Sequence, residues 1–225
     1  MAKPRRTKGQ AKGSVKGQTQ RVQTWLADAY PGTAQELCAL KYRNPYELLA
    51  ATILSAQCTD EMVNKVTPTL FDRYPTPADL ADANPLELEE IVHATGFYRS
   101  KAKNLLGMAN AIEEKYSGQV PSALEDLVTI PGVGRKTANV VRSVVFNEPG
   151  LPVDTHVTRL SNRLGLTTET NPVKIEHELN ELVRAEDRGV FSLRLILHGR
   201  AVCIARKPKC RECGLADICP AAEPA

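Results

Sequence analysis

Four of the six cysteines lie close together in the last part of the sequence, where their thiolates could bind one metal centre. Cys203, Cys210, Cys213 and Cys219 have the spacing C-x6-C-x2-C-x5-C. Ribbon-type zinc sites usually pair two CxxC knuckles, and this stretch contains one, formed by Cys210 and Cys213. The spacing also differs from the common ferredoxin runs. It therefore predicts a metal centre and favours an iron–sulfur cluster, with zinc as the alternative.

A second stretch, LVTIPGVGRKTANVV at residues 127–141, combines a tight turn with an amine. We expect a helix that is capped by Ser122 and ends at Pro131, because the residue before a proline avoids the α region. Gly132 and Gly134 should supply the positive φ values of the reversal. A second helix then begins at Arg135. The apolar residues on its buried face are Ala138, Val141, Val144 and Val145.

Such a hairpin has a chemical use, because its backbone N–H groups can approach a phosphate closely. The positive end of the second helix points to the same place, and Arg135 adds a charge. Both also disfavour an ammonium ion on Lys136, which frees its amine to act as a nucleophile. The alternatives are a plain helix–turn–helix corner and an exposed lysine without a chemical role.

Asp154 follows Pro152-Val153 and precedes a predicted helix, so we expect it to cap that helix. A capping carboxylate accepts N–H bonds and stays ionised. It can therefore also stabilise positive charge that develops in a reaction. We expect His156, two residues further on, to be structural.

Four cations lie within or beside the cysteine spacing, and they could contact phosphates from a rigid loop. They are Arg206, Lys207, Lys209 and Arg211. The alternative is a solvated charged loop. The two remaining cysteines, Cys38 and Cys58, are interpreted as small buried residues.

The elements that must position these residues are predicted to be helices, with short loops rich in Pro and Gly. We find no alternating strand and no Asn-Gly hairpin signal, so the fold class is all-α. The expected helices cover residues 22–30, 46–57, 60–73, 85–94, 98–116 and 190–205, and others run on from Ser122, Arg135, Thr155 and Pro172.

The charge of the chain is small overall but unevenly placed. The net charge is +3, yet residues 1–21 contain seven basic residues and no acidic one. The rest of the chain therefore contains 22 of the 29 basic residues and all 26 acidic residues. We expect residues 1–20 to form a disordered basic tail, and any DNA affinity of the folded part to come from local patches. No secretory signal or membrane span is apparent, and six cysteines without a leader suggest a reducing compartment. We therefore expect a cytoplasmic chain, and its predicted phosphate-binding groups would place it at the nucleoid if they bind DNA.

The motifs above resemble those of the endonuclease III family of helix–hairpin–helix DNA glycosylases. The resemblance rests on residues 127–141, on LSAQCTD at residues 54–60, on VDTH at residues 153–156 and on the four clustered cysteines, in the order of that family. It extends over residues 22–220, nearly the whole chain.

The resemblance implies a two-lobed all-α fold with a DNA groove between the lobes. A six-helix barrel would span residues 41–149, with the helix–hairpin–helix at 121–146. Residues 21–40 and 150–225 would form the second lobe around a [4Fe–4S] cluster. The implied cluster ligands are Cys203, Cys210, Cys213 and Cys219.

The resemblance also implies a role for each site residue. Lys136 would attack C1′ of a damaged nucleoside, expel the base and form a Schiff base that permits β-elimination, with Asp154 as the catalytic carboxylate. Gln57 would fill the gap left by the flipped base. Phe97 aligns with a second wedge, where the family also uses aliphatic residues. Gly132, Gly134, Arg135, Arg206, Lys207 and Lys209 would contact the DNA backbone.

The expected function is that of a bifunctional DNA glycosylase and apurinic/apyrimidinic lyase, a monomer that removes oxidised pyrimidines from double-stranded DNA. Two alternatives remain. Monofunctional adenine glycosylases share the hairpin, the aspartate and the cluster, but they typically lack the lysine at position 136. A non-catalytic iron–sulfur protein that binds DNA or senses redox state would not need Lys136 and Asp154 together.

Overall fold

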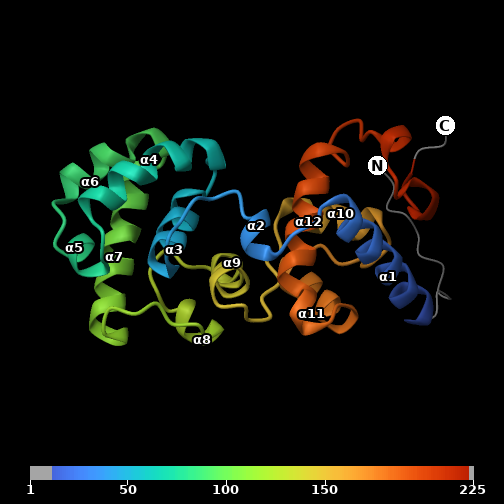
Figure 1. Cartoon of the computed structure of the whole chain (residues 1–225), viewed down its shortest axis with the longest axis horizontal. Coiled ribbons are helices and arrows are strands. Elements are labelled where there is room, and N and C mark those ends of the chain that lie inside the picture. Colours follow the sequence, from blue (N-terminus) through green and yellow to red (C-terminus); the bar gives the residue numbers. More distant parts are fainter. Residues whose placement is uncertain (1–11, 223–225) are drawn as a thin grey trace. The chain divides into compact units, whose positions relative to one another are not determined.

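The computed structural model of the 225-residue chain describes residues 12–222, and their side chains from residue 15 onward. Over these residues the fold is all-helical and contains no strand, as the sequence predicts. The chain forms two compact units (Figure 1). Unit 1 contains residues 1–33 and 153–225, and unit 2 contains residues 34–152. None of the described helices is long and apolar enough to cross a membrane.

Unit 2 is built around one buried helix and a long helix beside it. Every residue of α3 (Pro45–Leu54) after its first is buried, and most of them are apolar. This helix contacts α4 (Asp60–Arg73), α7 (Tyr98–Tyr116) and α9 (Arg135–Val145). Helix α7 is also covered by α5 (Pro77–Ala81), α6 (Pro85–Val92) and the 3₁₀ turn η1 (His93–Thr95). Two short helices complete the unit, α2 (Ala34–Leu37) and α8 (Leu124–Leu127).

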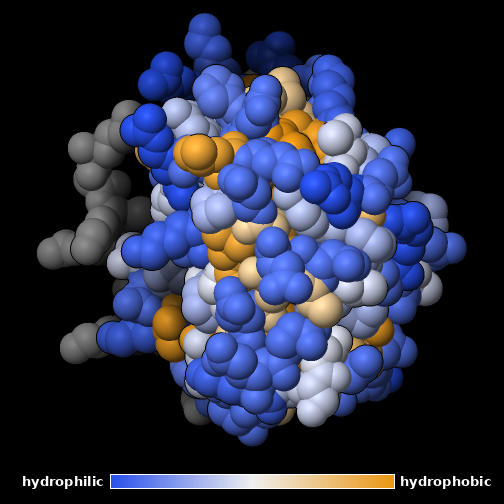
Figure 2. Space-filling view, turned by 90° about the vertical axis from the view of Figure 1, so that its left-hand side faces the viewer, coloured by the Kyte–Doolittle hydropathy of each residue, from blue (hydrophilic) through white to orange (hydrophobic). Residues whose placement is uncertain are grey.

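Side-chain caps fix where several of these helices begin. Thr59 accepts a hydrogen bond from the backbone N–H of Met62 at the start of α4. Thr76 and Asp79 form a reciprocal capping box on α5. Figure 2 views the molecule from the side of unit 2 on which α5 and α6 lie. Its surface there is mostly hydrophilic, with hydrophobic residues in small separate patches.

Unit 1 packs α1 (Lys12–Ala29) and α10 (Thr155–Arg163) against α12 (Arg188–Ala201). Helix α11 (Pro172–Leu182) and the turn η2 (Ala185–Asp187) connect α10 to α12. The cysteine-rich segment follows, with two short turns, η3 (Cys210–Glu212) and η4 (Ala216–Ile218).

The expectation of a disordered tail up to residue 20 is wrong for residues 12–20, which belong to α1. Thr19, Val22 and Leu26 are fully buried on one face of this helix, so it has a packed stripe that its polar composition hides. Gln18 also donates hydrogen bonds to the carbonyls of Leu164 and Ile218. The rest of the expected tail lies outside the described residues.

The boundaries between the units also differ from the predicted ones. They fall after residues 33 and 152, whereas the sequence suggested residues 40 and 149. Residues 34–40 join unit 2 because α2 packs against α9. The helices at 60–73 and 98–116 have the predicted bounds, but α3 ends at Leu54 and α12 at Ala201, earlier than expected.

Candidate functional site

The hairpin of unit 2 lies between α8 and α9. Helix α8 begins at Leu124, and its N-cap residue Ala123 makes no side-chain hydrogen bond, so the expected Ser122 cap is wrong. The helix ends at Leu127, before Pro131. The N–H of Val133 donates to the carbonyl of Ile130 at 3.0 Å and closes the turn.

The two hairpin glycines serve different purposes. Gly132 has φ +79°, as predicted, whereas Gly134 has φ −88° and is the extended N-cap residue of α9, so its predicted positive φ is wrong. A Cβ on Gly132 would lie 2.8 Å from Cβ of Asn104 in α7, so this glycine permits close packing. A Cβ on Gly134 would meet nothing within 4 Å, so packing within the protein does not explain that glycine.

Helix α9 begins directly after the hairpin, and its N-cap residue Gly134 has no side chain that could cap the first turn. The N-terminal end of a helix is a general binding site for anions such as phosphate. Arg135 and Lys136 occupy the first turn, and Ala138, Val141 and Val144 form the buried face below them. The Lys136 side chain is exposed and makes no hydrogen bond or ion pair within the described part of the chain. The amine is therefore accessible to a substrate.

Asp154 in unit 1 caps α10, as the sequence predicts. Its Oδ1 accepts hydrogen bonds from the backbone N–H groups of His156 at 2.8 Å and Val157 at 2.9 Å. Since one oxygen makes both capping bonds, Oδ2 remains for another partner.

Backbone strain marks three of the residues that were expected to touch DNA. Among the described residues, five non-glycine residues have φ in the left-handed region, and they are Gln57, Phe97, Ser117, Asn147 and Lys207. Such conformations are uncommon outside glycine and tend to cluster at functional sites. Gln57 is exposed, and 67% of the Phe97 surface is accessible. Both residues project from turns of unit 2 that the surrounding fold holds in place.

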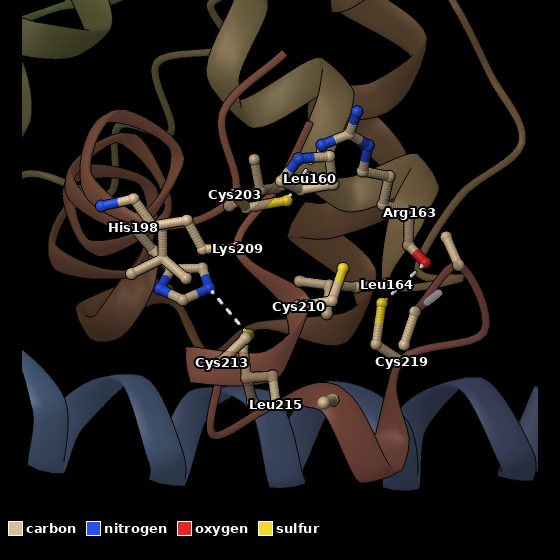
Figure 3. A pocket seen from close by; sticks show the side chains of 15 residues that line it. Leu160, Arg163, Leu164, His198, Cys203, Lys209, Cys210, Cys213, Leu215 and Cys219 are labelled. Atoms are coloured by element: carbon tan, nitrogen blue, oxygen red, sulfur yellow. Dashed lines mark hydrogen bonds between the residues drawn. The ribbon is translucent and has the colours of Figure 1, made fainter. Parts of the chain in front are cut away.

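The four clustered cysteines line one pocket in unit 1 (Figure 3). Cys203, Cys210, Cys213 and Cys219 are free, half-buried thiols around a cavity of about 30 Å³. Burial raises the pKa of the Cys213 thiol, and the nearby sulfurs of Cys203 and Cys210 raise it further. Burial raises the pKa of Cys219 in the same way. When these four thiols lose their protons, the negative charges of the thiolates repel one another. The site therefore favours a cationic centre that the four thiolates can bind.

The arrangement distinguishes a cluster from a single ion. Sulfurs around one tetrahedral zinc ion, with Zn–S bonds of about 2.3 Å, lie about 3.8 Å apart. Among the described residues, no three His, Cys, Asp or Glu side chains come together closely enough to hold one ion. The four sulfurs surround a space, which suits a four-iron cluster because each thiolate then binds its own iron.

Two arginines that the sequence analysis missed support the cysteine segment from α10. Arg159 donates to the carbonyls of Gly199 and Cys203, at 2.9 and 3.0 Å. Arg163 donates to the carbonyls of Ile204 and Ala205, at 2.8 and 2.9 Å. Their spacing of four residues places both on one helix face, and this spacing was the feature of the sequence that could have indicated them.

His198 of α12 is a third support that the sequence did not reveal. Only 1% of its surface is exposed, and it lies between a tyrosine and a cysteine. Its Nδ1 is 3.0 Å from the hydroxyl of Tyr30, and its Nε2 is 3.4 Å from Sγ of Cys213 (Figure 3). The edge-on ring of Trp25 packs against the imidazole at 5.3 Å.

The four cations of the cysteine segment are all exposed, as a surface that contacts phosphate requires. They are Arg206, Lys207, Lys209 and Arg211. Lys207 has φ +54°, and the backbone N–H of Lys209 donates to the carbonyl of Val202 at 3.1 Å. The carbonyls held by Arg163 lie just before these cations. The loop is therefore fixed from within while its charged groups face solvent.

Comparison with known proteins gives the same assignment for both parts of the chain. Residues 50–185 match the HhH-GPD superfamily of base excision DNA repair proteins, and residues 203–219 match the iron–sulfur binding domain of endonuclease III. The chain is 54% identical to endonuclease III of Synechocystis sp. over 88% of its length and 90% of that protein. It is 47% identical to endonuclease III of Bacillus subtilis over 86% of its length and 88% of that protein.

Solved structures agree with the sequence comparisons. A non-covalent endonuclease III–DNA complex has a TM-score of 0.86 and 40% identity, and the match covers 92% of this chain and 96% of that one. A trapped endonuclease III–DNA covalent intermediate has the same TM-score and coverage, with 41% identity. From these matches, the helical fold and the four-cysteine pocket, we conclude that this chain belongs to the endonuclease III family of base excision DNA repair proteins.

Proposed function

We propose that this protein is a bifunctional DNA glycosylase and apurinic/apyrimidinic lyase that acts on double-stranded DNA containing damaged bases or abasic sites. Its family membership supports this, since a relative that is 41% identical has been trapped as a covalent complex with DNA. The observation that carries the proposal is Lys136. It presents an accessible amine in the first turn of α9, directly after a hairpin whose glycine N-cap leaves the helix without a side-chain cap.

In this proposal the hairpin anchors a phosphate and Lys136 carries out the chemistry. Gly132, Gly134 and Arg135 bind the backbone of the strand that carries the lesion. The Lys136 amine attacks C1′ and the bond from C1′ to the base breaks, so that the base leaves with the electron pair and takes up a proton. The sugar ring then opens to give an imine between Nζ and C1′. Loss of a proton from C2′ expels the 3′ phosphate.

We assign the charge-stabilising role to Asp154. Positive charge develops on the sugar as the base departs, and a fixed carboxylate stabilises it without having to reorient. The capping bonds from His156 and Val157 hold the carboxyl group in place and leave Oδ2 for the reaction.

The proposed DNA contacts separate into wedges and phosphate anchors. Gln57 and Phe97 enter the duplex when the damaged nucleotide is flipped out, which an enzyme acting on a base requires. Arg206, Lys207 and Lys209 bind phosphates and contribute affinity without sequence preference. A [4Fe–4S] cluster on Cys203, Cys210, Cys213 and Cys219 would tie the cysteine segment together, and with it the loop that carries these cations.

We further propose oxidised pyrimidines as the substrate class and the nucleoid as the place of action. The test uses borohydride trapping on duplexes that contain an oxidised pyrimidine, adenine opposite an oxidised guanine, or an abasic site. We expect covalent adducts with the oxidised pyrimidine and with the abasic site. Adenine release without an adduct would indicate the monofunctional alternative. Binding without either product would indicate a non-catalytic protein.

A further inference from the structure

Lys101 is a buried lysine that takes no part in the proposed reaction. It lies near the start of α7, and 4% of its surface is exposed. Its Nζ donates a hydrogen bond to the carbonyl of Thr95 at 2.7 Å. Lysines are almost never this deeply buried unless a partner requires them. The partner here is one carbonyl, in the turn that precedes α7.

That turn is the one that presents Phe97. The backbone N–H of Lys101 donates to the carbonyl of Phe97 at 3.0 Å, so this one residue holds two carbonyls of the turn. Phe97 is the N-cap residue of α7 with φ +49°, and no side-chain hydrogen bond caps the helix there. The turn is also anchored at Thr95, which is buried and whose hydroxyl donates to the carbonyl of Val92 at 2.8 Å.

The turn that presents Gln57 lies near the same amine. The thiol of Cys58, the neighbour of Gln57, lies close enough to Lys101 to raise the pKa of the amine, although burial has the larger effect and lowers it. The adjoining elements also pack together, since α4, which follows Cys58, contacts η1. Lys101 therefore lies close to both turns, since its amine donates to the carbonyl of Thr95 in the Phe97 turn and lies near Cys58 in the Gln57 turn.

This arrangement costs stability. Burial lowers the pKa of Lys101 because the ammonium form is disfavoured in the folded protein. The unfolded chain therefore holds the proton up to a higher pH than the folded chain. The penalty is complete below the folded-state pKa and shrinks as the pH rises from there towards about 10.4. An apolar side chain of the same length would avoid it, so stability alone does not account for a lysine at this position.

We infer that Lys101 is a positioning residue for base extrusion, because it holds the turn that presents Phe97 in its left-handed conformation beside the turn that presents Gln57. The inference rests on the proposed role of Phe97 as a wedge. A wedge whose turn is already in the required conformation enters the duplex without the entropic cost of ordering a loop. A turn that was not held in this conformation would have to be ordered each time a base is extruded.

The test is Lys101→Met, which keeps the length of the side chain and removes the donor. We expect single-turnover excision of an oxidised pyrimidine from duplex DNA to fall roughly ten-fold or more, since small displacements of positioning groups have effects of this size. The melting temperature should change little, because the Thr95 carbonyl loses its donor while a buried ammonium is also removed. Cleavage of a pre-formed abasic site should change less, because no base has to be extruded. A merely structural lysine would instead lower the melting temperature and both activities together.

Two further comparisons complete the experiment. Lys103→Met, which replaces an exposed lysine of the same helix, should match the wild type in every assay. In a Phe97→Ala background, Lys101→Met should have little further effect on excision. If Lys101→Met lowers excision equally in both backgrounds, the positioning role is wrong while the wedge role of Phe97 stands. If Phe97→Ala alone excises at the wild-type rate, the wedge role fails and the inference fails with it. If the Met variant does not fold, Lys101→Leu, which also lacks the donor, carries the same comparison, and Lys101→Gln, which retains an N–H donor, should keep more of the excision rate.

Discussion

The Nε2 atom of His198 lies 3.4 Å from Sγ of Cys213, one of the four cysteines that line the pocket of unit 1. A thiolate that binds iron can only accept a hydrogen bond, so Nε2 must carry the proton. Nδ1 of a neutral ring is then an acceptor, and the Tyr30 hydroxyl, 3.0 Å away, donates to it. The result is a directed chain of hydrogen bonds from Tyr30 through His198 to the proposed cluster ligand.

His198→Phe should loosen the cluster without removing a ligand. The phenyl ring can keep the packing against Trp25, but it cannot donate to Cys213. We expect iron to be lost to a chelator on the order of 10-fold faster, as is typical when a hydrogen bond to a metal ligand is removed. The decrease of visible absorbance over time measures this. Cys210→Ser, which removes a ligand, should give colourless protein, and Cys38→Ser should match the wild type. An unchanged rate in His198→Phe would show that the hydrogen bond to Cys213 is not important.

The sequence predicted the proposed cluster ligands but not the residues that support them. The cysteine spacing, the hairpin and the Asp154 cap are local patterns, and Lys136, Asp154 and the four cysteines lie in the expected elements, whereas the Ser122 cap does not form. Arg159, Arg163 and His198 support the pocket through contacts with residues 15 to 44 positions away, and no local pattern contains such pairs. The start of α1 was missed for the same reason. Its buried stripe depends on packing partners that lie far away in the sequence.

The sequence also did not predict the backbone conformation of several turn residues. Two glycines next to one proline suggested two positive φ values, but Gly134 is an extended N-cap. Gln57 and Phe97, which are not glycines, adopt the left-handed conformation instead. Residue type alone gives no sign of this, because the surrounding fold imposes the strain. Likewise, nothing in the sequence around Lys101 indicated that its amine would be buried.

The stability of unit 1 should depend on pH through His156. Burial lowers the pKa of His156, which disfavours the imidazolium in the folded protein. The unfolded chain binds this proton near pH 6.5, so the free energy of unfolding should fall as the pH drops below about 6.5 and level off below the folded-state pKa. His156→Gln should make the decrease in melting temperature between pH 7 and 5 smaller. Burial lowers the pKa of His198 too, so part of the decrease should remain. An unchanged decrease in the variant would contradict the prediction.

The exposed cations of the cysteine segment should contribute affinity without specificity. We expect Lys207→Ala or Lys209→Ala to weaken binding about equally on duplexes of different sequence. The slope of log affinity against log salt should become shallower by roughly one for each phosphate that the variant no longer neutralises. Fluorescence anisotropy at several salt concentrations measures both effects. Lys174→Ala, which removes an exposed lysine of α11 outside this loop, is the matched control. Slopes equal to that of the wild type in both variants would show that the loop does not bind DNA.

Asp154→Asn separates the capping role of this residue from its charge. The amide oxygen can still accept the N–H bonds of His156 and Val157, so the protein should fold with little change in melting temperature. Removal of a fixed charge near the reacting sugar should slow base excision on the order of 10²–10³-fold. Single-turnover excision rates together with thermal melting test both parts. A variant that melts normally and excises at the wild-type rate would leave Asp154 with a capping role alone.

Lys136→Gln tests the nucleophile itself. Glutamine keeps a long polar side chain in the first turn of α9, where Lys136 is exposed and bonded to no described residue, so folding and affinity for damaged duplex should change little. The variant has no amine at this position, so it should give no borohydride-trapped adduct and very little strand cleavage. Combined with Asp154→Asn, the two decreases in rate should not add, because both residues serve one transition state. Lys103→Gln, on an exposed lysine of α7, should trap normally. If Lys136→Gln still traps at the wild-type rate, another amine is the nucleophile, and the lysine after the hairpin only helps to bind the phosphate.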